Sequence, residues 1–180
     1  MPEYITTYGG THFYPTEPKA EDVHIHDIAH ALSLICRGNG QVQQFFSVGQ
    51  HCIRCAREAK ARGYSPRMVL ACLLHDAGEC YLSDVPRPFK KEIPTYTAYE
   101  DRILSVIYTK YLGSDLTVEE QKQLKQIDDD LLYFDIRDLL REPQDREQPR
   151  MMVEFHYEVE PFAEVEQQYL DLFFAYLHLL

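Results

Sequence analysis

The hydrophobic pattern of the chain begins with one clear amphipathic segment. From Ile25 to Ile35 the apolar residues recur at the one-sided spacing of a helix, and the pattern ends near Gly38 and Gly40. Arg37 therefore lies at the end of the first expected helix. The preceding residues 1–20 are rich in Tyr, Thr, Gly and Pro without helical spacing, which predicts a short hairpin or an irregular arm.

Capping residues mark the next two helices. Ser47 is a suitable N-cap for a helix that runs through Arg62. Ser65 is followed by Pro66, a residue favoured in the first helical turn, and together they open a helix that we expect to run through Cys80.

The second half of the chain predicts a proline-rich loop and further helices. Three prolines break the pattern over residues 84–95, directly after the third helix, and a fourth helix is expected over residues 99–112. Thr117 and Glu120 form a capping box for a fifth helix that reaches about Leu140.

The C-terminal region predicts one more helix, over about residues 161–178. Pro161 opens it, and its apolar residues fall on one face that suits either the core or a homodimer contact. About six helices with short connections predict an all-α bundle. We expect a single domain over residues 1–180, with its core at about residues 20–141.

Composition and charge narrow the classes of function. The chain of 180 residues is 45% hydrophobic and 26% charged, as expected of a packed domain, and its formal net charge is −11. This charge repels long nucleic acids and anionic membrane surfaces, so an anionic partner should be a small molecule. No apolar run approaches the ~20 residues of a membrane span, and residues 1–10 do not resemble a secretory signal. We expect a cytoplasmic protein.

The segment from Leu73 to Glu79 is the sharpest chemical feature. It places His75 beside Asp76 at the end of an apolar helix, with Glu79 one turn later. Burying Asp76 is costly without a cation or a metal as partner. Two further candidate ligands, His51 and Asp128, lie on the second and fifth expected helices, so three helices could bring four N and O ligands to one ion.

Each part of this set also has a simpler interpretation. A lone inward histidine such as His51 is usually a hydrogen-bonded core residue, and an acidic run such as residues 128–130 is usually solvated. His24, His26 and His30 are interpreted as capping or surface residues. The five cysteines favour buried helical thiols over a disulfide framework or a zinc motif; they are Cys36, Cys52, Cys55, Cys72 and Cys80.

Taken together, these residues resemble the H…HD…D pattern of the HD-domain metal-dependent phosphohydrolases. The resemblance extends to the YfbR-like nucleotidase branch, which includes 5′-deoxynucleotidases and phage dATP triphosphohydrolases. It covers about residues 20–141 in ordered blocks, namely Asp27–Ser33, Ser47–His51, Leu73–Lys90 and Asp128–Leu140.

The resemblance implies roles for eight residues. His51, His75, Asp76 and Asp128 would bind one divalent transition ion (Mn, Co, Fe, Ni or Zn), and Mg is also compatible. Glu79 matches the catalytic carboxylate that assists proton transfer, and Asp84 matches a second acidic position near the sugar or the attacking water. Arg37 matches a phosphate-binding arginine, and Lys90 is a further phosphate candidate. From the residues alone, the favoured interpretation is a helix-end salt bridge for Glu79 and Asp84 and a surface charge for Arg37, and the resemblance reverses this preference.

The resemblance therefore implies an HD-type enzyme that hydrolyses a nucleoside 5′-monophosphate or triphosphate, with a deoxyribonucleotide favoured. The alternative is a catalytically idle module that binds a metal or a nucleotide. No histidine lies between His75 and His156, which favours one metal over two. The sequence differs at Gly38 from the nucleotidase branch that it resembles, because members of that branch tend to have a bulky aromatic residue there.

Overall fold

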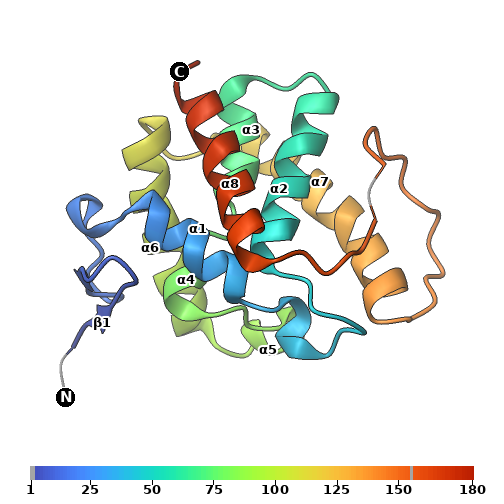
Figure 1. The fold of residues 1–180 in the computed structure, drawn as a ribbon, viewed down its shortest axis with the longest axis horizontal. Coiled ribbons are helices and arrows are strands. Elements are labelled where there is room, and N and C mark those ends of the chain that lie inside the picture. Colours follow the sequence, from blue (N-terminus) through green and yellow to red (C-terminus); the bar gives the residue numbers. More distant parts are fainter. Residues whose placement is uncertain (1–2, 155) are drawn as a thin grey trace.

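Helices make up most of the structure. It is a computed structural model that describes residues 3–154 and 156–180 (Figure 1). The helices are α1 (Ile25–Leu34), α2 (Val48–Ala61), α3 (Pro66–Leu74), α4 (Glu79–Leu82), α5 (Arg87–Lys90), α6 (Pro94–Leu112), α7 (Val118–Phe134) and α8 (Phe162–Leu177). Two 3₁₀ turns, η1 (Ala20–Asp22) and η2 (Arg37–Gly40), and a π-helical turn, η3 (Asp135–Leu139), complete the helical elements. The expected all-α class is confirmed.

The N-terminal arm is a short hairpin. Its strands β1 (Ile5–Thr6) and β2 (His12–Phe13) pair antiparallel. The buried Phe13 ring stacks on Tyr81, with the ring centroids 3.6 Å apart. The amide of Gly9 also donates a hydrogen bond of 2.6 Å to Asp27 Oδ1 on α1. These contacts fix the arm against the helices, and the expected hairpin is confirmed.

The predicted caps begin the helices where the sequence indicated. Ser47 Oγ accepts from the amide of Gln50, whose side chain returns to the Ser47 amide. Thr117 and Glu120 form the same reciprocal pair at the start of α7. Each capping box satisfies amide donors that the first helical turn leaves unpaired.

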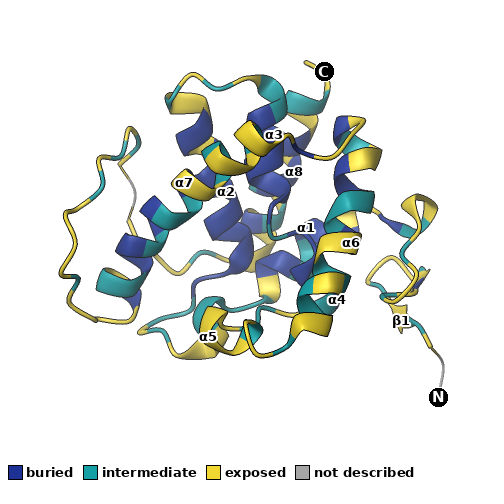
Figure 2. Ribbon diagram, turned by 180° about the vertical axis from the view of Figure 1, so that it is seen from behind, coloured by how far each residue is buried: buried dark blue, intermediate teal, exposed yellow. Residues whose placement is uncertain are grey.

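Helix α8 packs its apolar face against the core. It contacts α1, α3 and α2, and the buried faces of these helices meet at the centre of the bundle (Figure 2). The buried residues of α8 are Val165, Tyr169, Leu170 and Phe173. Gly49 on α2 permits the close approach, because a Cβ there would lie 3.2 Å from the Leu32 backbone and 3.2 Å from Val165 Cγ1.

The third helix is shorter than expected. It ends at Leu74 instead of Cys80, and a tight turn then leads into α4. The amide of Ala77 donates to Leu74 O at 2.9 Å, and that of Glu79 donates to Asp76 O at 3.0 Å. These i to i+3 bonds replace the regular helical ladder. His75 and Asp76 therefore lie on a turn and not on a helix.

Other boundaries also differ in detail. The expected loop at residues 84–95 contains the short helix α5, and Pro94 already opens α6. The fifth helix changes from α to π geometry after Phe134. Two of the five cysteines, Cys36 and Cys80, are partly exposed, so the expectation of five buried thiols is wrong. None of the helices in the described ranges has the length and apolarity needed to cross a membrane.

Tyr169→Phe should destabilise the fold by about 1–2 kcal/mol, because Tyr169 Oη donates a buried hydrogen bond of 2.7 Å to Leu73 O at the end of α3. Urea denaturation followed by circular dichroism measures this change. Tyr8→Phe is the control, since Tyr8 is 70% exposed. Removal of its hydroxyl group should lower the free energy of unfolding by less than about 0.5 kcal/mol. Equal stability of the two variants would contradict the prediction.

Candidate metal centre

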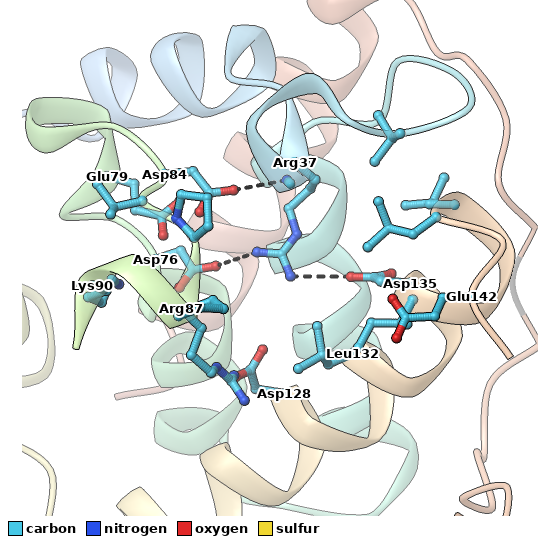
Figure 3. Close-up of a pocket in the computed structure, with 18 of the residues that line it drawn as sticks. Arg37, Asp76, Glu79, Asp84, Arg87, Lys90, Asp128, Leu132, Asp135 and Glu142 are labelled. Carbon is cyan, nitrogen blue, oxygen red and sulfur yellow. Dashed lines mark hydrogen bonds and ion pairs between the residues drawn. The ribbon is translucent and has the colours of Figure 1, made fainter. Parts of the chain in front are cut away.

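A pocket lined by both charged and apolar side chains opens beside the turn that follows α3. Its volume is about 570 Å³, within the usual range for small-molecule sites. Six of the eight residues singled out from the sequence line it (Figure 3): Arg37, Asp76, Glu79, Asp84, Lys90 and Asp128. The other two, His51 and His75, are buried, with exposed fractions of 0% and 8%.

Four candidate ligand atoms converge from three parts of the fold. His51 lies on α2, His75 and Asp76 lie on the turn after α3, and Asp128 lies on α7. His51 Nε2 is 3.2 Å from Asp128 Oδ1 and 3.9 Å from Asp76 Oδ2. His75 Nε2 is 3.2 Å from Asp76 Oδ2 and 3.9 Å from Asp128 Oδ1. Each imidazole thus faces both carboxylates.

The two shorter separations, of 3.2 Å each, fit a single ion. Two atoms that each lie ~2.1 Å from one metal are about 3.0 Å apart at a right angle and about 3.4 Å apart at the tetrahedral angle. His75 Nε2 is buried, yet no hydrogen bond to it is found among the described residues, because its neighbour Asp76 Oδ2 does not have hydrogen-bond geometry. A nitrogen aimed at a common point between ligands has this arrangement.

The second ring nitrogen of His75 supports the same assignment. His75 Nδ1 lies 2.8 Å from the backbone carbonyl of Cys72, an acceptor, so Nδ1 carries the proton and donates it. Whenever the ring is neutral, its lone pair is therefore on Nε2, which faces the carboxylates.

The charges of the site are strongly coupled. Burial by itself raises the pKa of Asp76, but the charge and contact of His75, followed by Arg37, lower it well below the usual range. The pKa of Asp128 is likewise lowered, against the effect of burial, mainly by His51. The pKa values of His51 and His75 are raised well above normal, although burial lowers both, because thiols and carboxylates surround them. The two carboxylates are therefore anionic and require positive charge nearby.

Two neighbouring thiols form alternative groups with the same histidines. Ligand atoms of His51, Cys55 and His75 lie within 4.8 Å of one another, as do those of Cys52, His75 and Asp76. Burial raises the pKa of the Cys52 thiol, so this sulfur stays protonated and is a poor ligand. Buried His, Cys and Asp groups at metal-binding distance are therefore present, and we favour the set with Asp76 and Asp128 because these carboxylates also reach the pocket.

Glu79 is a buried carboxyl group at the edge of the candidate ligand set. It begins α4, is 3% exposed, and its Oε2 forms no hydrogen bond with any described residue. Burial raises its pKa well above normal, and the charges of Asp76 and Asp84 raise it further. Glu79 can therefore hold a proton that a neighbouring reaction could use. Asp84 Oδ2 instead accepts from the amide of Gly38 at 3.2 Å.

Arg37 lies inside the site and not on the surface. Its Nη1 is 3.4 Å from Asp76 Oδ2, and its Nη2 is 3.2 Å from Asp135 Oδ2 (Figure 3). The turn η2 that carries it has left-handed backbone at Gly38 and Asn39, with φ of 58° and 54°. Glycine at position 38 is compatible with this backbone because it has no Cβ.

The proline-rich loop supplies two cations. Lys90 Nζ lines the pocket but pairs with Glu100, at 2.7 Å and 3.0 Å from its two carboxylate oxygens. Arg87, which sequence reasoning did not select, donates to Asp128 Oδ2 at 3.0 Å and to Asp129 Oδ1 at 3.1 Å. Arg87 is half exposed at the pocket edge, so it is the more accessible of the two.

Sequence reasoning also missed Asp135 and Tyr157. Asp135 is buried, and its Oδ1 accepts from Tyr157 Oη at 2.6 Å. In the sequence, Asp135 follows an acidic run on an acidic chain, and nothing in that pattern distinguishes it from a solvated residue. The other histidines behave as expected of surface residues: His24 and His26 are exposed, and His30 pairs with Glu166 at 2.9 Å.

Comparison with known proteins finds relatives whose names state no activity. No protein-family model matches the chain. The chain is 38% identical over 108 residues to the uncharacterised protein YfdR of Escherichia coli K12, a match that covers 60% of this chain and 58% of YfdR. It is 36% identical over 101 residues to the uncharacterised protein RCAP_rcc00048 of Rhodobacter capsulatus, covering 53% of this chain and 51% of that protein. The chain thus spans little more than half the length of these two relatives.

Proposed function

We propose that the protein is a metal-dependent phosphohydrolase of the HD type that acts on a small nucleotide. The observation that carries this proposal is the convergence of two imidazoles and two carboxylates at the base of a pocket that also holds a buried carboxyl group and a partly buried arginine. A structural ion alone would require the four ligands but neither the accessible pocket nor a carboxyl group with a raised pKa.

His51, His75, Asp76 and Asp128 would hold one divalent ion. Their mixed nitrogen and oxygen donors suit Mn, Fe, Co, Ni or Zn, and the carboxylates also accept Mg. When bound there, such an ion supplies Lewis acidity toward a phosphate oxygen and lowers the pKa of a bound water.

Glu79 and Asp84 would manage the protons of the reaction. Burial and the charges of Asp76 and Asp84 raise the pKa of Glu79, which favours a role for this group in proton transfer. Asp84 lines the pocket, and its hydrogen bond from the Gly38 amide fixes the carboxylate there. Both carboxyl groups line the same pocket.

Arg37, Arg87 and Lys90 would bind the phosphate. The guanidinium of Arg37 is held by two carboxylates at the pocket base, so its donors are oriented before a substrate arrives. Arg87 and Lys90 lie nearer the edge, where a phosphate would compete with Asp128 and Glu100 for them. These few fixed cations bind a small anion in spite of a net charge of −11.

One wall of the pocket suits an organic group attached to the phosphate. It is apolar and comes from the η2 side and from α7 with the residues that follow it; its members are Val42, Leu132, Ile136, Leu139 and Leu140. A nucleoside presents a flat, weakly polar face to such a wall while its phosphate lies toward the cations. This division supports a nucleotide over inorganic polyphosphate as the substrate.

The direct test is a product-resolved assay of ribo- and deoxyribonucleoside mono-, di- and triphosphates with Mn, Co, Ni, Zn or Mg added. Nucleoside with phosphate would identify a nucleotidase, and nucleoside with triphosphate would identify a triphosphohydrolase. Thermal stabilisation by metal and nucleotide without turnover would instead favour the alternative, an idle binding module.

Asp76→Ala should lose both bound metal and activity, because it removes a ligand between the two imidazoles. Glu79→Gln should retain the metal and lose turnover, because the amide keeps the shape of the side chain but cannot transfer the proton. Metal content by mass spectrometry, measured beside turnover, separates the two variants. Asp138→Ala is the control, since this exposed carboxylate pairs with Arg137. Full metal retention in Asp76→Ala would refute the ligand assignment.

Arg37→Ala should lower kcat/KM by about 100- to 1000-fold, the usual effect of removing one donor from a developing phosphate charge. Its metal content should stay at the wild-type level, because the guanidinium is not a ligand. Arg37→Lys tests the geometry, since it keeps the charge but not the planar pair of donors. Wild-type kcat/KM in Arg37→Ala would remove Arg37 from the site.

A further inference from the structure

Asp135 is a buried carboxylate that contacts three different parts of the site. It is 6% exposed and lies where α7 changes into the π-helical turn η3. Its Oδ2 is 3.4 Å from His51 Nδ1 and 3.2 Å from Arg37 Nη2, and its Oδ1 accepts from Tyr157 Oη at 2.6 Å. Local π geometry inside helices is frequently associated with functional sites.

We propose that Asp135 is a positioning residue that orients His51 as a metal ligand and holds Arg37 toward the phosphate. This inference rests on the proposed function. Asp135 does not touch the substrate or the ion in this scheme; it acts through the two side chains it contacts.

The argument for His51 comes from its two ring nitrogens. Nε2 faces Asp128 and Asp76, so Nδ1 must carry the proton if Nε2 is to donate its lone pair. Nδ1 is buried and forms no hydrogen bond of ordinary geometry in the described part of the chain, and Asp135 Oδ2 is the carboxylate oxygen beside it. Hydrogen bonds of this kind often tighten only when the site is engaged.

His75 provides an internal comparison. Its Nδ1 donates to the Cys72 carbonyl at 2.8 Å, while its Nε2 faces the carboxylates. The two histidines thus have the same arrangement, one supported by a backbone carbonyl and the other by the Asp135 carboxylate. Such outer partners fix the orientation of a ligand histidine and increase its basicity.

Arg37 shares one of its two carboxylate partners, Asp76, with the candidate metal site. Asp76 Oδ2 contacts Arg37 at 3.4 Å and also lies 3.2 Å from His75 Nε2. Once that oxygen binds an ion, its negative charge is shared and its hold on Arg37 weakens. Asp135 Oδ2, at 3.2 Å, is then the carboxylate oxygen that keeps the partly buried guanidinium paired and in place.

Tyr157 fixes the orientation of Asp135 itself. Its hydroxyl engages Oδ1, which leaves Oδ2 directed at His51 and Arg37. The pKa of Asp135 is lowered to about 2: burial alone would raise it, but the contact with His51 and the charge of Arg37 lower it more. Tyr157 belongs to the long segment between η3 and α8, so this segment also contributes to the site.

The test compares Zn²⁺ affinities of the full-length protein by competition with a chromogenic chelator. Asp135→Asn should weaken Zn²⁺ binding by about 10- to 100-fold, as loss of an outer partner of a ligand does. Tyr157→Phe keeps the charge and should weaken it by about 3- to 10-fold, the effect of one lost hydrogen bond. Asp138→Asn, the same substitution at an exposed position of the same turn, should leave the affinity unchanged.

Two further measurements distinguish positioning from a general loss of stability. In the Zn²⁺-loaded protein, the Nδ1 proton of His51 should give a hydrogen-bonded signal in nuclear magnetic resonance spectra that Asp135→Asn loses. Asp135→Asn should also raise KM for the nucleotide in the wild-type background but not in the Arg37→Ala background, because its effect on KM acts through Arg37.

Wild-type Zn²⁺ affinity in Asp135→Asn, with or without a lower melting temperature, would overturn the inference and leave the proposed function intact. If Asp135→Asn does not fold, Tyr157→Phe decides in its place, and an unchanged affinity there would equally overturn it. Failure of the wild-type protein to bind Zn²⁺, Mn²⁺ or any other divalent ion would overturn the proposed function together with this inference.

Discussion

The candidate site depends on a cluster of negatively charged carboxylates at the base of the pocket. Asp76, Asp128 and Asp135 converge there, and the partly buried Arg37 pairs with Asp76 and Asp135. Burying carboxylates is unfavourable unless positive charge compensates them. In the protein by itself, His51 and His75 provide it, since their pKa values are raised and those of the facing carboxylates are lowered. A divalent ion held by the same four side chains would supply positive charge at the same point.

This charge cluster is possible because separate elements hold its members. Helix α2 carries His51, the turn after α3 carries the His75–Asp76 pair, and α7 carries Asp128. Helix α8 packs behind α3, where Tyr169 binds the carbonyl of Leu73 immediately before the turn. The core thus fixes the backbone on both sides of the polar cluster. A rigid apolar frame is what allows like charges to remain within a few ångströms of one another.

Local signals in the sequence were sufficient for the fold but not for the environment of each side chain. Helix starts at Ser47, Ser65 and Thr117 were predictable because capping is a short-range interaction. The end of α3 at Leu74 was not, because the apolar pattern continues to Cys80 and the turn contains no proline. The turn directs the His75–Asp76 pair toward α2 and α7. These helices are distant from the pair in the sequence, so no local pattern indicates the turn.

The same distinction separates the site residues that the sequence indicated from those it missed. The His75–Asp76 pair stood out because two ionisable groups end an apolar helix, whereas Asp135 resembles any acid of an acidic chain. What distinguishes Asp135 is long-range: His51, Arg37 and Tyr157 reach it from sequence positions far from its own. A residue that acts through its neighbours carries no local signature of its own. Its role can be inferred only where the positions of all its partners are known, and here they lie in α2, in η2 and in the segment before α8.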